Sequence, residues 1–124
     1  MDPLDIARCI YTALDEKQGR DIIVLDVEEL VGYTSYFVLV SGGSDRQVQA
    51  LVEHVRRHVR AELGIRPLGI EGTQKGKWAL IDFADVVVHV FREDERDFYD
   101  LEGLWRDAPH IDFESGQPAE SDAP

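Results

Sequence analysis

A glycine-serine turn and a few carboxylates are the first residues of this chain whose types and spacing could do chemistry. The run Ser41-Gly42-Gly43-Ser44 precedes a helical pattern, and the backbone N–H groups of such a turn can bind a phosphate. Metal-dependent phosphoryl transfer at this turn would also need carboxylates to hold the metal, for example a pair spaced by one residue on a following strand. The clear pair with that spacing, Asp26 and Glu28, precedes the turn, and two residues separate Asp82 from Asp85. We therefore interpret the turn as a helix cap.

Histidines are the other candidates for metal binding or catalysis. His54 and His58 have the four-residue spacing of a helical metal-binding pair, but Arg56 and Arg57 lie between them and oppose a cation. We interpret these histidines as surface residues. His89 lies inside a valine-rich strand and is interpreted as a hydrogen-bonded structural residue. The sequence thus predicts no catalytic residue, no cofactor and no metal.

Two apolar side chains flanked by carboxylates indicate a different kind of site. In a strand from Trp78 to Phe83, alternation places Trp78, Leu80 and Asp82 on the same face. With Glu71 nearby, this face would have an apolar centre and an acidic edge, which is the anatomy of a protein-binding site. The alternative is that the C-terminal helix covers this face and makes Trp78 part of the core. Alternation alone leaves both interpretations open.

The composition limits the choice of partner. The 124 residues carry a formal net charge of -12, which argues against a general nucleic-acid coat, because phosphate binding relies on Lys and Arg. This charge fits a basic protein partner, and it fits solubility alone. One helix carries a local basic stripe formed by Arg46, Arg56, Arg57 and Arg60. We interpret the stripe as a solvated helix face first and as an RNA contact second.

The elements that position these residues follow from hydrophobic periodicity and helix caps. Helices are predicted from Asp2-Pro3 to about Gly19, from Ser44 to Gly64 and from about Glu93 to Trp105; strands are predicted at 21–28, 36–41, 69–72, 78–83 and 86–91. Ala84-Asp85 forms a hairpin tip, and 29–35 is a connection. Gly19 is expected to end the first helix in a left-handed conformation. The order predicts an α/β fold, a mixed β-sheet of about five strands with helices packed on it.

The chain divides into a domain at 1–106 and a tail at 107–124. The tail has no apolar periodicity and no basic residue, so we expect it to be acidic and disordered. Cys9 is the single cysteine, which excludes an internal disulfide, and we interpret it as a small buried hydrophobic residue. No N-terminal segment has the pattern of a signal peptide or membrane span. We therefore expect a soluble, cytoplasmic protein.

Several of these segments together resemble the ribosomal silencing factor family, also called the Iojap-like family. They are DIIVLDV, TSYFVLVSGGSDRQVQAL, GIEG, the strand pair from Trp78 to Phe91 and the run R-x-F-Y-D-L-E-x-L-W, within a match from about Pro3 to Pro109. The resemblance implies a fold similar to that of nucleotidyltransferases, without an established transferase site. One departure is Ser35, where many relatives carry an aspartate before the Tyr-Phe pair.

The resemblance also implies a function. Members of this family are non-enzymatic translation repressors that bind the large ribosomal subunit through ribosomal protein number fourteen. They block joining of the small subunit when nutrients are scarce or in stationary phase. On this chain the partner-facing positions would be Trp78 and Leu80 as the apolar anchor, with Glu71, Asp82, Tyr99 and Asp100 as companions. Three alternatives stay open: a nucleotide-binding or nucleotidyltransferase-like protein, a direct RNA-binding module, and a homodimer of the free protein that hides the same surface.

Overall fold

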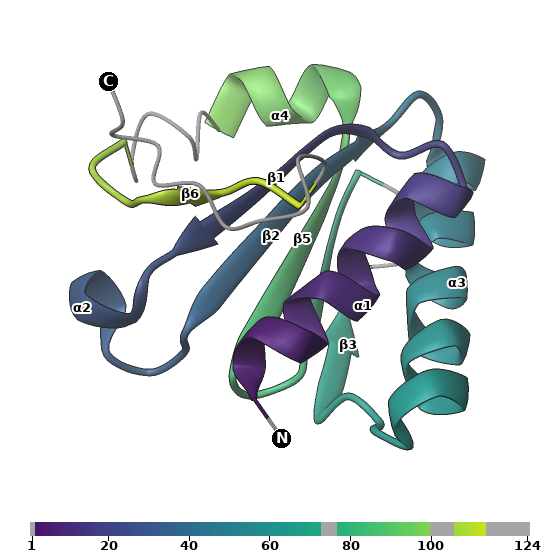
Figure 1. Cartoon of the computed structure of the whole chain (residues 1–124). Helices are drawn as coiled ribbons and strands as arrows, with labels where there is room; N and C mark the ends of the chain where they lie inside the picture. The colour runs from purple at the N-terminus through teal and green to yellow at the C-terminus, as the bar shows by residue number, and fades with distance from the viewer. Residues whose placement is uncertain (1, 73–76, 100–105, 114–124) are drawn as a thin grey trace.

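The protein is an α/β domain built on one mixed sheet, shown by a computed structural model that describes residues 2–72, 77–99 and 106–113 (Figure 1). Within these residues, six strands form the sheet in the order β3-β4-β5-β2-β1-β6. The central pair, β2 (Tyr36–Gly42) and β5 (Val86–Arg92), is parallel, whereas the other described neighbours are antiparallel. Both central strands are buried on both faces, as their continuous apolar runs predict. The predicted fold class is therefore confirmed, with six strands where the sequence indicates about five.

Two long helices cover one face of the sheet (Figure 1). α1 (Pro3–Glu16) begins as predicted, because the Asp2 side chain accepts a hydrogen bond from the backbone N–H of Leu4. α3 (Asp45–Leu63) is capped by Ser44, which accepts from the N–H of Gln47, and ends at Gly64 with φ of +71°. The predicted apolar stripe of α3 is buried, namely Val48, Leu51, Val52, Val55 and Val59.

The end of α1 differs from the prediction. Gln18, with φ of +60°, is the residue in the left-handed region, and Gly19 is not. A Cβ on Gly19 would lie 2.6 Å from the Cγ2 of Val40, so close packing against β2 explains this glycine. Cys9 is half-buried and packs at the edge of the core, so it is less enclosed than predicted.

The first two strands are joined by a segment that is more ordered than expected. β1 (Arg20–Asp26) leads into α2 (Glu28–Val31), a single helical turn inside the predicted connection. Gly32 ends it with φ of +78°. The irregular pairing of β1 with β2 between Arg20 and Ile23 coincides with a positive φ at Asp21.

The hairpin and the last helix follow the predicted order. β3 (Gly69–Glu71) pairs with β4 (Trp78–Asp82), which turns at Ala84 and Asp85 into β5. α4 (Glu93–Tyr99) then packs against β5 and β2. The rest of the helix predicted to reach Trp105 lies outside the described residues.

The packed part of the chain extends beyond the predicted boundary at residue 106. β6 (His110–Ile111) adds to the edge of the sheet beside β1. Ala108 and Phe113 are buried, and the Phe113 ring packs edge-on against Tyr11 at 5.6 Å between ring centroids. Single apolar residues in a polar segment carry no periodic signal, so the sequence assigns them to the tail. The predicted disorder of residues 114–124 lies outside the described residues.

Candidate protein-binding surface

The strand register brings four of the six predicted partner-facing residues to one face of the sheet. Trp78, Leu80 and Asp82 alternate along β4, and Glu71 of β3 pairs with Leu80. Their strand neighbours Ala79 and Ile81 point into the core beneath α1 and α3. The alternation in the sequence therefore predicts the two faces of β4 correctly. Tyr99 ends α4, but its side chain and the whole of Asp100 lie outside the described residues.

The apolar centre of this surface rests on an aromatic layer. The Trp78 ring stacks on Phe91 at 5.0 Å between centroids with an interplanar angle of 27°. His89 lies beside both rings and meets Phe37 edge-on at 4.9 Å. Trp78 and Leu80 are half-buried, so neither extreme considered from the sequence holds. Each of the two side chains packs against the aromatic layer and also keeps part of its area exposed to solvent.

His89 supports this layer as a neutral ring. It is 7% exposed, and within the described residues neither of its ring nitrogens has a hydrogen-bond partner. Burial disfavours the charged form and lowers the pKa of His89 to about 4. The residue is structural, as predicted, but ring packing and not a hydrogen bond holds it.

One carboxylate at the acidic edge of the surface also stabilises the fold. Asp82 Oδ1 accepts a hydrogen bond from the N–H of Ala84 at 2.8 Å, which fixes the hairpin turn where Ala84 has φ of +73°. Asp82 is half-buried, whereas Glu71 and Asp85 are exposed. These carboxylates can attract a basic partner while the aromatic layer holds β4 in place.

Two backbone N–H groups at the glycine-serine turn are used within the chain. The N–H of Gly43 donates to Gln47 Oε1 at 2.7 Å, and the Ser44 hydroxyl accepts from the N–H of Gln47. Ser41 is fully buried and its Oγ accepts from Arg96. This arrangement is a helix cap, in agreement with the interpretation of the sequence.

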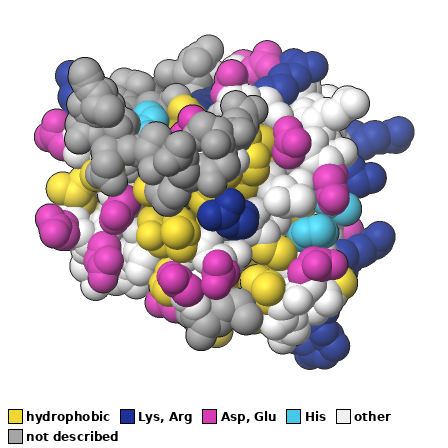
Figure 2. Space-filling view, viewed as in Figure 1, with side chains coloured by type: hydrophobic (Ala, Val, Ile, Leu, Met, Phe, Trp, Pro, Cys, Tyr) yellow, Lys and Arg dark blue, Asp and Glu magenta, His cyan; other side chains and the backbone are white. Residues whose placement is uncertain are grey.

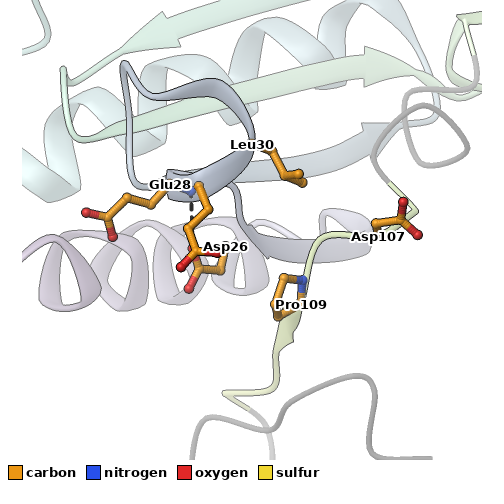
Figure 3. A pocket seen from close by; sticks show the side chains of 6 residues that line it. Asp26, Glu28, Leu30, Asp107 and Pro109 are labelled. Atoms are coloured by element: carbon orange, nitrogen blue, oxygen red, sulfur yellow. Dashed lines mark hydrogen bonds between the residues drawn. The ribbon is translucent and has the colours of Figure 1, made fainter.

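The pair Asp26 and Glu28 lies far from that turn. Asp26 pairs with Tyr36 at the start of β2, whereas the turn follows the end of β2, roughly 20 Å away along the strand. Asp26 Oδ1 accepts from the N–H of Glu28 at the start of α2. Figure 3 shows both residues beside a pocket that is also lined by Leu30, Asp107 and Pro109. The separation opposes a joint metal and phosphate site of the nucleotidyltransferase type.

Arg96 is a positioning residue that the sequence does not reveal. It is 5% exposed, and its Nη1 donates to the Asp21 carbonyl at 2.8 Å and to Ser41 Oγ at 2.9 Å. These bonds attach α4 to the irregular start of β1 and to the end of β2. Arg92, next to α4, is held by Asp45 and Asp94 at 2.7 and 2.8 Å. Charged residues in a helix pattern are usually exposed, so only the fold identifies Arg96 as buried.

The fold and this surface define an α/β domain whose distinctive feature is an apolar and acidic sheet face at β3 and β4. The chain belongs to the ribosomal silencing factor family: the family model described as "Ribosomal silencing factor during starvation" matches residues 1–124. This membership gives the protein a role in ribosome silencing and translation regulation.

Individual relatives agree with the family assignment. The chain is 40% identical over 116 residues to the ribosomal silencing factor of Bacillus subtilis, which covers 94% of this chain and 98% of that protein. It is 34% identical over 98 residues to mouse mitochondrial assembly of ribosomal large subunit protein 1, covering 77% of this chain and 43% of that protein. A crystal structure of a Chromobacterium violaceum protein has a TM-score of 0.81 at 39% identity, covering 86% and 88% of the two chains. No helix in the described part of this chain is long and apolar enough to cross a membrane.

Proposed function

We propose that this protein represses translation by binding the large ribosomal subunit through ribosomal protein number fourteen. The bound domain would occupy space that the small subunit needs, so joining is blocked without any chemical step. In this proposal the protein is not an enzyme, acts in the cytoplasm and lowers translation under starvation or in stationary phase.

One observation supports the choice of surface. Trp78 and Leu80 form a half-buried apolar centre on the aromatic layer, and Glu71 and Asp82 flank it on a chain of net charge -12. A rigid aromatic anchor with charged neighbours is the usual composition of a binding hot spot. A basic ribosomal protein complements this charge and would be attracted to it before contact.

Sedimentation of ribosomal subunits tests the mechanism. Purified small and large subunits are mixed with the protein under conditions that give joined ribosomes and are separated on a sucrose gradient. We expect fewer joined particles, and we expect the protein to travel with the large subunit. Undisturbed joining, with the protein at the top of the gradient, would contradict the proposal.

Replacement of Trp78 by alanine tests the anchor. Loss of a central hot-spot residue costs on the order of 2 kcal/mol or more, which corresponds to an about 30-fold weaker affinity for the large subunit. Tyr33→Ala is the matched control, because Tyr33 is an aromatic residue that is 69% exposed beyond α2. Urea denaturation checks that both variants are folded. A folded Trp78→Ala variant with unchanged affinity would exclude Trp78 as the anchor.

A direct RNA contact is a second candidate, supported by a pocket lined by Arg56, Arg60, Arg66 and Pro67. Three guanidinium groups around one hollow suit a phosphate, although Arg56 is already paired with Glu53. If this pocket binds RNA, Arg60→Glu reduces affinity for naked ribosomal RNA and lowers its salt dependence. Equal RNA affinity of both proteins would dismiss this contact.

Self-association of the free protein is a related expectation. A homodimer that covers Trp78 and Leu80 would compete with ribosome binding, since both use the same sheet face. Sedimentation equilibrium of the wild type and Trp78→Ala tests it. A monomer at all concentrations would refute the dimer without affecting the subunit-joining proposal.

A further inference from the structure

Two histidines and a glutamate from different helices meet at the seam between α1 and α3. Glu16 is the last residue of α1, while His54 and His58 lie one turn apart on α3. One carboxylate oxygen, Glu16 Oε1, lies 2.9 Å from His54 Nε2 and 3.7 Å from His58 Nδ1. One ligand atom from each of the three residues lies within 4.8 Å of the other two. Figure 2 shows histidine side chains at the surface on the α3 side, with acidic side chains beside them.

The packing of the two helices fixes this arrangement. α1 and α3 form an extensive contact, and Gln47 Nε2 donates to the carbonyl of Gln18 at 3.3 Å just beyond the end of α1. The side chains of His54 and His58 are only 25% and 18% exposed. Their rings lie 5.7 Å apart between centroids. The three residues are therefore held near each other by the fold and not by a flexible loop.

The two arginines between the histidines share one carboxylate, Glu53, which offsets part of their positive charge. Arg56 and Arg57 both form ion pairs with Glu53, one turn before Arg57 on the same helix. The Arg57 side chain is 72% exposed and can move away into solvent.

We propose that Glu16, His54 and His58 form a zinc-binding site that links α1 to α3. Two imidazoles and a carboxylate are an established zinc ligand set, with a fourth position left for water. A tetrahedral ion with bonds of about 2.0–2.1 Å holds its ligand atoms about 3.3 Å apart. The distances from Glu16 Oε1 to the two histidine nitrogens, 2.9 and 3.7 Å, lie on both sides of that value. Small side-chain rotations would therefore bring these atoms to the spacing that zinc needs. The ion would take the place of the hydrogen bond between Glu16 and His54 and would join two helices that cover the core.

Isothermal titration calorimetry with zinc chloride on the untagged full chain is the direct test. We expect one zinc ion per chain and a rise in the thermal midpoint as zinc is added, because the ion binds the folded state. Glu16→Gln, His54→Gln and His58→Gln should each weaken binding by at least about tenfold, since even indirect partners of a metal ligand contribute that much. Cobalt substitution gives a second readout, the intense visible absorption of a tetrahedral site, which the three variants should lose.

Two control variants distinguish this site from other zinc binding. Cys9→Ser removes the single thiol, and His110→Ala removes an exposed histidine on β6. Both should bind zinc like the wild type. Absence of binding and of any midpoint shift would overturn the proposal. Binding that survives in the three site variants, or that disappears in Cys9→Ser or His110→Ala, would also overturn it. These outcomes are independent of subunit joining, which tests a different surface.

Discussion

Replacing Gly72 by alanine tests whether the candidate protein-binding surface depends on the close approach of β3 and β4. Gly72 has φ of +82°, and a Cβ at this position would lie 2.1 Å from the carbonyl oxygen of Trp78. Atoms in van der Waals contact with a carbon normally lie at about 3.5 Å. The obstructing atom belongs to the backbone and cannot rotate away, so one strand must shift. Because Glu71 precedes Gly72, the shift would move Glu71 relative to Trp78 and Leu80.

The expected loss in the free energy of unfolding is the sum of two costs, and it cannot exceed the free energy needed to detach β3. A left-handed conformation costs a residue with a Cβ about 1–2 kcal/mol, and overpacking against fixed atoms costs about 1–3 kcal/mol. The loss is bounded because the strained chain can instead detach β3. This mostly exposed edge strand pairs through Gly69, Ile70 and Glu71. We expect a loss of roughly 3 kcal/mol, which lowers the thermal midpoint of a domain of this size by on the order of 10 °C.

Urea denaturation of the wild type, Gly72→Ala and Gly69→Ala measures this difference. Gly69 lies at the other end of β3, has no positive φ, and a Cβ there would meet nothing within 4 Å. We expect Gly69→Ala to stay within about 0.5 kcal/mol of the wild type, as is usual for surface substitutions. Gly72→Ala should also bind the large subunit less tightly than Gly69→Ala. Equal stability of the two variants would refute the steric argument.

Two further predictions concern the buried residues Arg96 and His89. Arg96→Met removes the hydrogen bonds to Asp21 and to the buried Ser41 hydroxyl, so we expect a loss of about 2–4 kcal/mol in the free energy of unfolding, with partial recovery in Arg96→Lys. A loss below 0.5 kcal/mol, which is about the surface value, would show that Arg96 does not hold α4. His89 has a folded-state pKa of about 4, below the value of about 6.5 in an unfolded chain, so its stabilisation is present above pH 6.5 and is lost as the pH falls towards 4. Between pH 6.5 and pH 4, the free energy of unfolding of the wild type, measured by urea denaturation, should therefore fall by about 3 kcal/mol relative to that of His89→Leu. A difference between the two proteins that does not change with pH would contradict a buried neutral imidazole.

Local signals in the sequence predict most of the elements and the faces of the strands. The Asp2 and Ser44 caps, the stripe of α3 and the alternation of Trp78 with Ala79 depend on residues close in the chain, where period and hydrogen-bonding capacity are sufficient. The family resemblance adds six predicted partner-facing positions, and the structure brings four of them, Glu71, Trp78, Leu80 and Asp82, to one sheet face. The half-buried state of Trp78 and Leu80 could not be read from alternation, because alternation does not show what packs on a face.

The features that the sequence does not predict depend on contacts between distant residues. Gly19 is a residue type that commonly ends helices, but its position is explained by Val40 of β2, which leaves no room for a side chain there. Phe113 has no periodic neighbours, and it is buried because Tyr11 and Arg8 of α1 pack against its ring. Glu16 joins His54 and His58 only when α1 packs on α3. Each of these cases requires the strand order and helix packing, which pattern analysis of single segments cannot supply.

The parallel pairing of β2 with β5 at the centre of the sheet has a consequence for how the chain folds. The crossover between Gly42 and Val86 contains α3, β3 and β4, so the two innermost strands meet only after this long excursion has closed. Contacts of such separation slow folding, because the entropy of the intervening chain is lost before the pairing is gained. During synthesis, Val38 and Val40 stay without their β5 neighbours until β5 has left the ribosome. Because the Trp78 ring stacks on Phe91 of β5, the face that carries Trp78 is complete only once β5 has joined the sheet.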